Sequence, residues 1–286
     1  MSFNVESPSV MQPLSLGNVI NAGVQLYRSH LKSYIRLAFI AYLWMFIPIY
    51  GWAKLLANLA LISRLAFGEL VNQPEEIETG RRFVNSRLWQ FLCTSLLMII
   101  IIAFLIILIS ITSLITLGSL GGLAVVANNI FSGNNVNIVV LTYLLTVIFF
   151  LILIITALCI STRFLLVEIP LAVEENVSAV STIGRSWDLT NRYVWRIMLI
   201  LFVAYLITIP IQLPFSILSN VIPIIINPLI KDNSNYGVIS LIISLIFSLG
   251  SAILVAPFWQ SIKAVIYYDL RTRREGLGLK LREHNI

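Results

Sequence analysis

The sequence predicts an all-α, polytopic membrane helical bundle with about six spans and amphipathic interface helices. Of the 286 residues, 58% are hydrophobic and 11% are charged, and the mean hydropathy is +0.93; a soluble domain carries about 25% charged residues. The 75 consecutive residues from Leu88 to Thr162 contain no Asp, Glu, Lys, Arg or His, whereas one span needs only about 20 apolar residues. These observations exclude a soluble enzyme, a disordered chain and a disulfide scaffold.

Residues 14–275 are expected to form a single membrane domain, between an N-terminal tail at 1–13 and a cytoplasmic C-terminal tail at 276–286. The first residues, up to Gln12, have no basic start followed by an apolar core, so no signal peptide is expected. Cys93 and Cys159 both lie inside apolar runs. We expect them to act as small hydrophobic residues and expect neither a zinc site nor another cofactor.

Transitions between polar and apolar segments place the six spans. In chain order they are about Tyr34–Tyr50, Trp52–Phe67, Trp89–Ile111, Ile138–Ile160, Ile197–Ile217 and Gly237–Phe258. The second span is the shortest and carries Lys54 and Arg64. Basic side chains near span ends reach the headgroups, so they are compatible with a span. The alternative is an amphipathic helix that lies flat on the membrane.

The net charge of +6 indicates orientation in the membrane, and no binding of nucleic acid is expected, because the basic residues flank the apolar runs. With six spans and a cytoplasmic N-terminus, 17 of the 19 Lys and Arg residues fall on the cytoplasmic side. If the second span were removed, Arg87 and its neighbours could not share a side with both Arg28 and Arg185. We therefore expect six spans, with both termini in the cytoplasm of a bacterium and the chain in its inner membrane or an internal membrane.

Two long segments are expected to be outer loops. Thr112–Asn137 is uncharged and rich in glycine, so it is predicted to be compact and rich in turns, and Leu218–Tyr236 is the other. Pro210 and Pro214 fall in the fifth span, where proline removes a helical hydrogen bond and favours a kink. Gln212 and Asn220 are the notable polar residues near these prolines.

Each odd span follows a short amphipathic segment, which suggests three repeats at 14–70, 77–163 and 176–275. The segments are Leu16–Arg36, Ile77–Trp89 and Val180–Arg196. The second and third share the pattern Gly-Arg-x-aromatic, and the first matches more loosely. The alternative is a coincidence of residue types that suit a membrane interface. In both cases the segments are expected to lie at the interface, with basic residues on lipid phosphates.

Two stretches carry a family resemblance. Arg163–Arg196 reads RFLLVEIPLAVEENVSAVSTIGRSWDLTNRYVWR, and Tyr267–Leu279 reads YYDLRTRREGLGL. Together they resemble the membrane domain of glycerophosphoryl diester phosphodiesterases and related bacterial multi-spanning proteins of unknown function. The resemblance covers most of the chain and implies a six-span helical domain with cytoplasmic ends. It does not imply phosphodiesterase activity, because in that family the chemistry belongs to a separate soluble domain.

The candidate contact residues lie in the same stretches. Glu168, Glu174 and Glu175 could act as acid–base carboxylates or cation ligands, but we favour pairing with nearby basic residues, because hydrolysis at a metal ion usually also uses histidine. The residues that could contact a lipid headgroup or a partner are Arg163, Glu168, Glu174, Arg185, Trp187, Arg271 and Arg274. Asp269–Arg273 and Arg271–Glu275 are i, i+4 pairs, so this end is expected to be a solvated helix with self-satisfied charges.

Three function classes remain open. We favour a non-catalytic scaffold or accessory subunit that organises lipids or partner membrane proteins, because the spans contain almost no ionisable residue. Its expected partners are anionic lipid headgroups at the cytoplasmic face, with another membrane protein or a second copy of the chain. The alternatives are a transporter or permease subunit, with a broken fifth span lining its site, and a lipid-active enzyme that uses Glu168 and Glu174.

Overall fold

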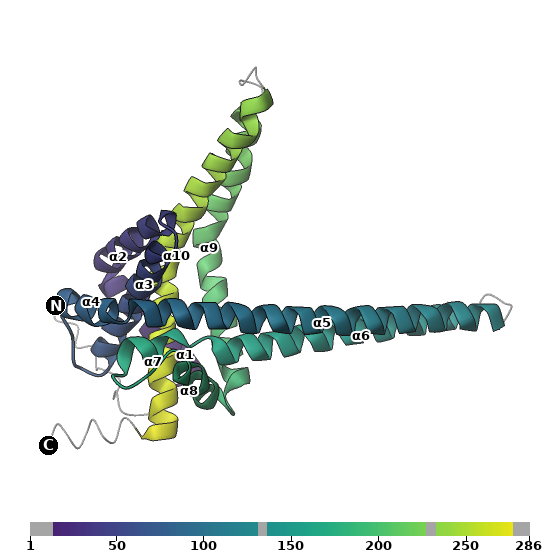
Figure 1. Cartoon of the computed structure of the whole chain (residues 1–286), viewed down its shortest axis with the longest axis horizontal. Coiled ribbons are helices and arrows are strands. Elements are labelled where there is room, and N and C mark those ends of the chain that lie inside the picture. Colours follow the sequence, from purple (N-terminus) through teal and green to yellow (C-terminus); the bar gives the residue numbers. More distant parts are fainter. Residues whose placement is uncertain (1–13, 131–135, 227–232, 277–286) are drawn as a thin grey trace. The chain divides into compact units, whose positions relative to one another are not determined.

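The computed structural model describes residues 14–130, 136–226 and 233–276, and every regular element in these ranges is helical (Figure 1). In chain order they are α1 (Leu16–Ser29), α2 (Leu31–Leu43), the 3-10 turn η1 (Trp44–Phe46), α3 (Tyr50–Leu70), α4 (Ile77–Ser86), α5 (Leu88–Ile130), α6 (Val136–Phe164), α7 (Glu168–Val173), α8 (Ser181–Thr190), α9 (Val194–Ile226) and α10 (Asn233–Glu275). The predicted N-terminal tail, the predicted C-terminal tail beyond Gly276 and the middle of both outer loops lie outside the described residues.

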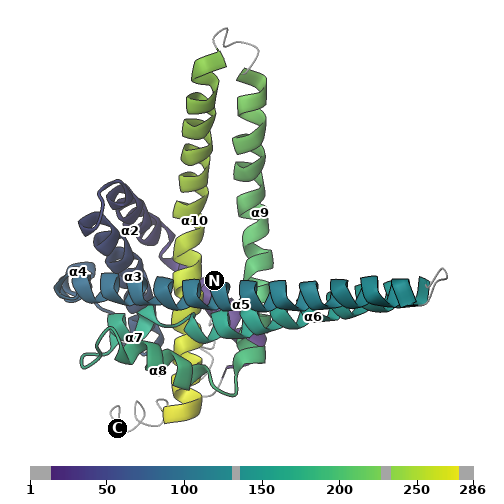
Figure 2. The same ribbon diagram turned by 45° about the vertical axis from the view of Figure 1, so that its right-hand side comes forward.

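The chain forms two compact units. Unit 1 combines residues 1–94 with residues 164–286, and unit 2 is Ser95–Arg163. Unit 2 consists of most of α5 and of α6, which lie side by side (Figures 1 and 2). Unit 1 holds the remaining helices and the packed core.

The described residues include four helices that are long and apolar enough to cross a membrane. They are Leu88–Gly122, Val140–Val173, Val194–Ile226 and Gly237–Glu275. Their sequences cover the predicted third to sixth spans. The chain is therefore a helical protein with the composition of an integral membrane protein, as the sequence predicts.

The predicted count of six spans is not confirmed. The first predicted span, Tyr34–Tyr50, is not one helix, because α2 ends at Leu43 and α3 begins only at Tyr50. The second, Trp52–Phe67, lies inside α3, where 11 of 21 residues are buried against other parts of the protein. Lys54 and Arg64 also lower its mean hydropathy. The two segments form a helical hairpin, α2–η1–α3.

The predicted outer loops are largely helical, which corrects the sequence interpretation. α5 continues to Ile130 and α9 continues to Ile226, through Pro210, Pro214 and Pro223. Glycine costs a helix only about 1 kcal/mol, and hydrocarbon favours a helix because backbone groups there need internal partners. Serine and threonine hydroxyls of α5 donate back to carbonyls of the preceding turn, as Thr116 Oγ1 does to Thr112 O at 2.8 Å.

The core of unit 1 forms around the C-terminal part of α10. Between Phe258 and Leu270 every residue of α10 is buried except two half-buried ones, Trp259 and Lys263. The ring of Phe67 on α3 lies 5.6 Å from that of Tyr267, and Ser63 Oγ donates to Gln260 Oε1 at 2.5 Å. α3 approaches closely because its buried positions are rich in alanine, at Ala53, Ala57, Ala60 and Ala66.

Three short amphipathic helices, α1, α4 and α8, each precede a pair of helices, which is short for α1 and long for α4 and α8. In α1 the buried residues are Val19, Gly23 and Leu26, which share one face. Gly80 and Val84 are buried in α4, and Ser186 and Leu189 are among the buried residues of α8. The three predicted repeats therefore contain the same order of elements, with α7 between the second and the third.

The close approach of α1 to α10 gives a testable prediction. A Cβ atom on Gly23 would lie 2.3 Å from Ile262 Cδ1, in a side chain that is fully buried. We expect Gly23→Ala to destabilise the protein by about 1–3 kcal/mol through overpacking. The measurement is thermal unfolding in mild detergent.

Gly17→Ala is the matched control on the same helix. Nothing lies within 4 Å of a Cβ atom at Gly17, so alanine there is expected to be neutral or to stabilise the helix by up to about 1 kcal/mol. Equal melting temperatures for the two variants would contradict the packing of α1 against α10.

Candidate functional site

Five side chains from three parts of unit 1 form a charge network, made of Glu174, Arg185, Tyr267, Arg271 and Glu275. Arg185 Nη2 lies 3.0 Å from Glu174 Oε1 and 2.5 Å from Glu275 Oε1. Tyr267 Oη donates to Glu174 Oε1, and Arg271 Nε donates to Glu275 Oε2 at 3.0 Å. Burial lowers the pKa of the Arg185 guanidinium, but the hydrogen bond and charge of Glu174 outweigh it and raise this pKa above its usual value.

A second cluster lies around Asp269, whose side chain is only 3% exposed. Its carboxylate accepts hydrogen bonds from Arg196 Nη2 at 3.1 Å, from Arg273 Nε at 3.0 Å and from Leu14 N at 2.8 Å. Arg273 Nη2 also donates to Leu14 O at 2.7 Å. The cluster holds the residue before the start of α1 against α9 and α10.

The predicted solvation of this end of α10 is therefore wrong, although the two i, i+4 pairs are present. Asp269–Arg273 and Arg271–Glu275 both form. Asp269 is nevertheless buried, because Leu14 and Arg196, which are distant in sequence, cover it. Buried charges need such partners, since an unpaired charge is costly in a low-dielectric interior.

Two arginines connect α3 and α4 with the end of α7. Arg64 Nε lies 2.6 Å from Glu75 Oε2, and Arg64 Nη1 donates to Ala172 O at 2.8 Å. Arg87 Nη1 donates to Leu171 O at 3.2 Å and to Glu174 O at 2.6 Å. Guanidinium groups satisfy the last carbonyls of a helix in this way. Burial and the nearby charge of Arg64 lower the pKa of Arg87.

The structure places the predicted contact residues in different settings. Glu174, Arg185 and Arg271 lie together in the charge network, and Glu168 Oε1 lies 2.7 Å from Lys263 Nζ. The ring of Trp187 is 41% exposed and 5.6 Å from that of Phe164. Arg274 is exposed, and Arg163 belongs to unit 2.

This arrangement holds the carboxylates in ion pairs. Glu168 and Glu174, two of the three glutamates considered for acid–base chemistry, both accept hydrogen bonds from basic side chains or from a tyrosine, whereas the third, Glu175, is exposed. Among the described residues, no group of three or more His, Cys, Asp and Glu could hold a metal ion. The network is suited to fixing α7, α8 and α10 against one another.

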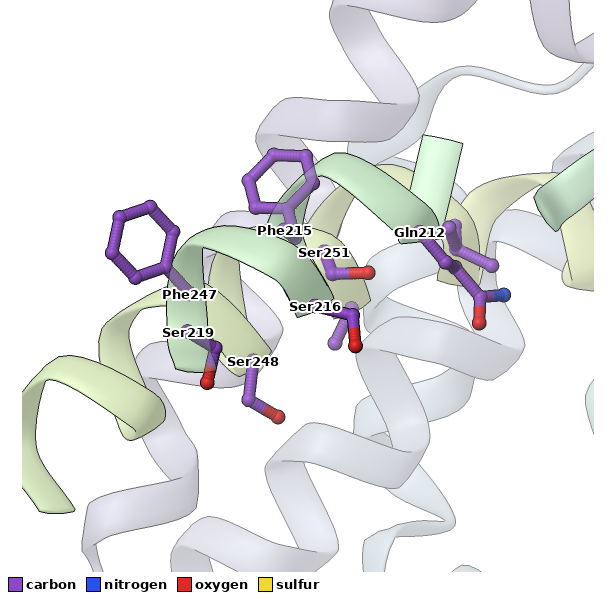
Figure 3. Close-up of a pocket in the computed structure, with 9 residues that line it drawn as sticks. Gln212, Phe215, Ser216, Ser219, Phe247, Ser248 and Ser251 are labelled. Atoms are coloured by element: carbon purple, nitrogen blue, oxygen red, sulfur yellow. The ribbon is translucent and has the colours of Figure 1, made fainter. Parts of the chain in front are cut away.

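A cavity lined by serine, glutamine and apolar side chains lies between α9 and α10, mostly within the predicted fifth and sixth spans. Its volume is about 430 Å³, and its lining includes Gln212, Phe215, Ser216, Ser219, Phe247, Ser248 and Ser251 (Figure 3). The hydroxyls of Ser216, Ser219 and Ser248 point to one side of the helix pair and the two phenyl rings to the other. No charged side chain is among the lining residues. We call it the α9–α10 cavity.

Sequence reasoning found only part of this cavity. It singled out Gln212, whose Nε2 donates to Thr208 Oγ1 at 3.0 Å. It also singled out Asn220, which does not line the cavity and donates to Ser216 O in its own helix. It missed the serines. Their spacing of three residues, Ser216 with Ser219 and Ser248 with Ser251, was the available signal.

Comparison of the chain with protein-family models, curated proteins and solved structures finds no match. The resemblance to glycerophosphoryl diester phosphodiesterase membrane domains stays a prediction. The described parts of its two stretches contact each other in the structure, where Arg185 pairs with Glu275 and Tyr267 bonds to Glu174. The residues behind the resemblance therefore build the charge network.

The charge network gives a second prediction. Glu174→Gln removes the carboxylate that Arg185 and Tyr267 share, and leaves Arg185 with Glu275 as its remaining carboxylate partner. We expect a loss of about 2 kcal/mol, below the roughly 3–5 kcal/mol of a fully buried pair, because the Glu174 side chain is 20% exposed. The measurement is the melting temperature in mild detergent.

Glu175→Gln is the control, because Glu175 follows Glu174 in the sequence and its side chain is exposed. We expect it to change stability by less than about 0.5 kcal/mol. Similar losses from both variants would show that the network does not hold this part of unit 1 together.

Proposed function

We propose that the protein is a non-catalytic integral membrane protein, a scaffold or accessory subunit that organises lipids or partner membrane proteins. The α9–α10 cavity is the observation that carries this proposal. It presents polar side chains on a helix pair whose composition suits hydrocarbon. The proposal agrees with the family resemblance, in which the chemistry belongs to a separate soluble domain.

Inside a bilayer, polar side chains need hydrogen-bond partners that only protein supplies. In the most apolar 18-residue stretch of α9, only 22% of the residues are buried within the protein, and in that of α10 only 6% are buried. Serine and glutamine on such helices find hydrogen-bond partners on a neighbouring helix, and small residues let helix backbones approach. The cavity therefore fits a transmembrane helix with small or polar side chains, supplied by a partner or by a second copy of the chain.

The proposed orientation places both termini in the cytoplasm. The six-span arrangement achieves this, and so does any even number of crossings. Exposed basic residues then face the anionic leaflet, including Arg28, Lys32, Arg36, Arg82 and Arg274. Each basic residue near such a surface contributes about 1 kcal/mol of attraction. Trp187, which is half exposed, suits the same interface.

The two alternatives have less support. A transporter site of the broken-helix type would interrupt the helix near the prolines, whereas α9 runs as one helix through Pro210, Pro214 and Pro223. A lipid-active enzyme would need a free carboxylate, whereas Glu168 and Glu174 are occupied by Lys263 and Arg185.

Filling the cavity tests the proposal. We expect Ser248→Trp to abolish co-purification of the partner or the second copy in mild detergent, because the indole occupies the space that a helix would use. The control is Ile246→Trp, at an exposed position of the same helix that does not line the cavity, and it should keep the complex. Chemical cross-linking in membranes, followed by mass determination, measures the complex.

Three results would contradict the proposal. One is a lone monomer with neither lipid nor partner bound in the unsubstituted protein. Another is solute flux in proteoliposomes that is lost in Gln212→Ala, which would favour a transporter. The last is turnover of a glycerophospholipid that is lost in Glu168→Gln, which would favour an enzyme.

A further inference from the structure

The hairpin α2–η1–α3 ends in an apolar tip, which we define as Leu43–Trp52. Its large side chains are exposed to between 44% and 62%, at Leu43, Met45, Phe46, Ile47, Ile49, Tyr50 and Trp52. The rest of the hairpin packs into unit 1, where Leu37, Ala38, Ala57 and Leu61 are buried. The exposed apolar surface is therefore concentrated at one end of an otherwise packed element.

The tip is a closed turn in which several backbone groups have partners within the turn. Ile47 N donates to Trp44 O at 3.1 Å, and Tyr50 N donates to Pro48 O at 2.8 Å. The indole of Trp52 donates to Met45 O at 3.2 Å. A Cβ atom on Gly51 would lie 2.1 Å from Trp44 O, so only glycine fits this turn. Backbone groups with internal partners are what hydrocarbon requires.

The hairpin is too short to cross a bilayer and return. The last charged residues on its two arms are Arg36 and Lys54. From Arg36 to Leu43 α2 rises about 10 Å, and from Lys54 to Tyr50 α3 rises about 6 Å, at 1.5 Å per residue. One leaflet of the hydrocarbon core is about 15 Å thick. The uncharged part of the hairpin therefore reaches into one leaflet only.

A contact in unit 1 places Lys54 beside the residues that precede the charge-free run. Lys54 Nζ donates to Asn85 Oδ1 at 3.0 Å. Asn85 is near the end of α4, three residues before Leu88, where α5 and the charge-free run of 75 residues start. The tip lies beyond Lys54 along α3. Exposed basic residues flank the base of the hairpin, at Arg28, Lys32, Arg36 and Arg82, and they suit lipid phosphates.

We propose that α2–η1–α3 is a re-entrant hairpin whose tip inserts among the acyl chains of a single leaflet and then returns to the side it came from. Arg28 before the hairpin and Arg87 after it then share one side of the membrane. The charge distribution that predicted six spans is satisfied by four crossings. Placing Arg28 and Arg87 on one side of the membrane therefore requires neither of the first two predicted spans.

Cysteine labelling tests the hairpin in the full-length protein. The background carries Cys93→Ser and Cys159→Ser, and the probe is Phe46→Cys at the tip. Ser86→Cys marks the side of α4, and Asn134→Cys marks the side of the segment that joins α5 and α6 in the sequence. A membrane-impermeant maleimide is applied to right-side-out and inside-out vesicles, and again after detergent is added.

We expect the two marker cysteines to react from opposite sides. Cysteine at position 46 should react from neither side until detergent is added. A nitroxide at position 46 should be accessible to oxygen and protected from a water-soluble nickel chelate, at a depth within one leaflet. Met45→Cys, at a neighbouring exposed position, repeats the measurement if the first variant is not recovered in the membrane.

Three outcomes would overturn the proposal. Reaction at position 46 from the side of Asn134 would show that the hairpin crosses the membrane. If the cysteine at position 46 reacted from the same side as the cysteine at position 86, and at the same rate, the tip would lie in water. A protected tip without enhanced oxygen access would show that protein, and not lipid, covers it.

Discussion

Charges have no favourable place in hydrocarbon, and this constraint organises the whole chain. Between Leu88 and Thr162 the sequence has no ionisable side chain except tyrosine and cysteine, so the charges concentrate at the base of the long helices, in unit 1. There they meet as pairs such as Asp269 with Arg196 and Glu174 with Arg185. Low dielectric makes such pairs necessary, because an unpaired charge in the same place would be costly.

α10 has an exposed apolar first part and a buried last part in the core of unit 1. Its first part carries Val238, Leu241 and Ile246, which are exposed and apolar, and its last part is the buried centre of unit 1. A single continuous helix thus connects the helix pair α9–α10 to the charged core. Close approach of α1 at Gly23 and of alanine-rich α3 makes that core dense, and dense cores transmit displacement instead of absorbing it.

The sequence predicts the features that depend on local pattern, such as helices and i, i+4 ion pairs. It does not predict the features that depend on contacts between residues far apart in the chain. The helical class and the four long apolar helices follow from hydropathy, and Asp269–Arg273 follows from helical spacing. The burial of Asp269 depends on Leu14 and Arg196, at sequence separations of 255 and 73 residues, so no local pattern shows it. The bend at Trp44–Ile49 was missed because Pro48 and Gly51 stand inside an apolar run that reads as one span.

The polar groups of the molecule lie in two different settings, the charge network of unit 1 and the uncharged α9–α10 cavity. In the charge network each carboxylate has a basic or hydroxyl partner from another helix, so it fixes geometry and leaves little for a ligand. The α9–α10 cavity is lined by serines from both helices, and their hydroxyls border the same space. A bilayer offers such hydroxyls only other protein or the chain itself as partners. In the proposed function, the uncharged helix pair α9–α10 therefore provides the recognition surface, and the charge network holds the core of unit 1 that supports it.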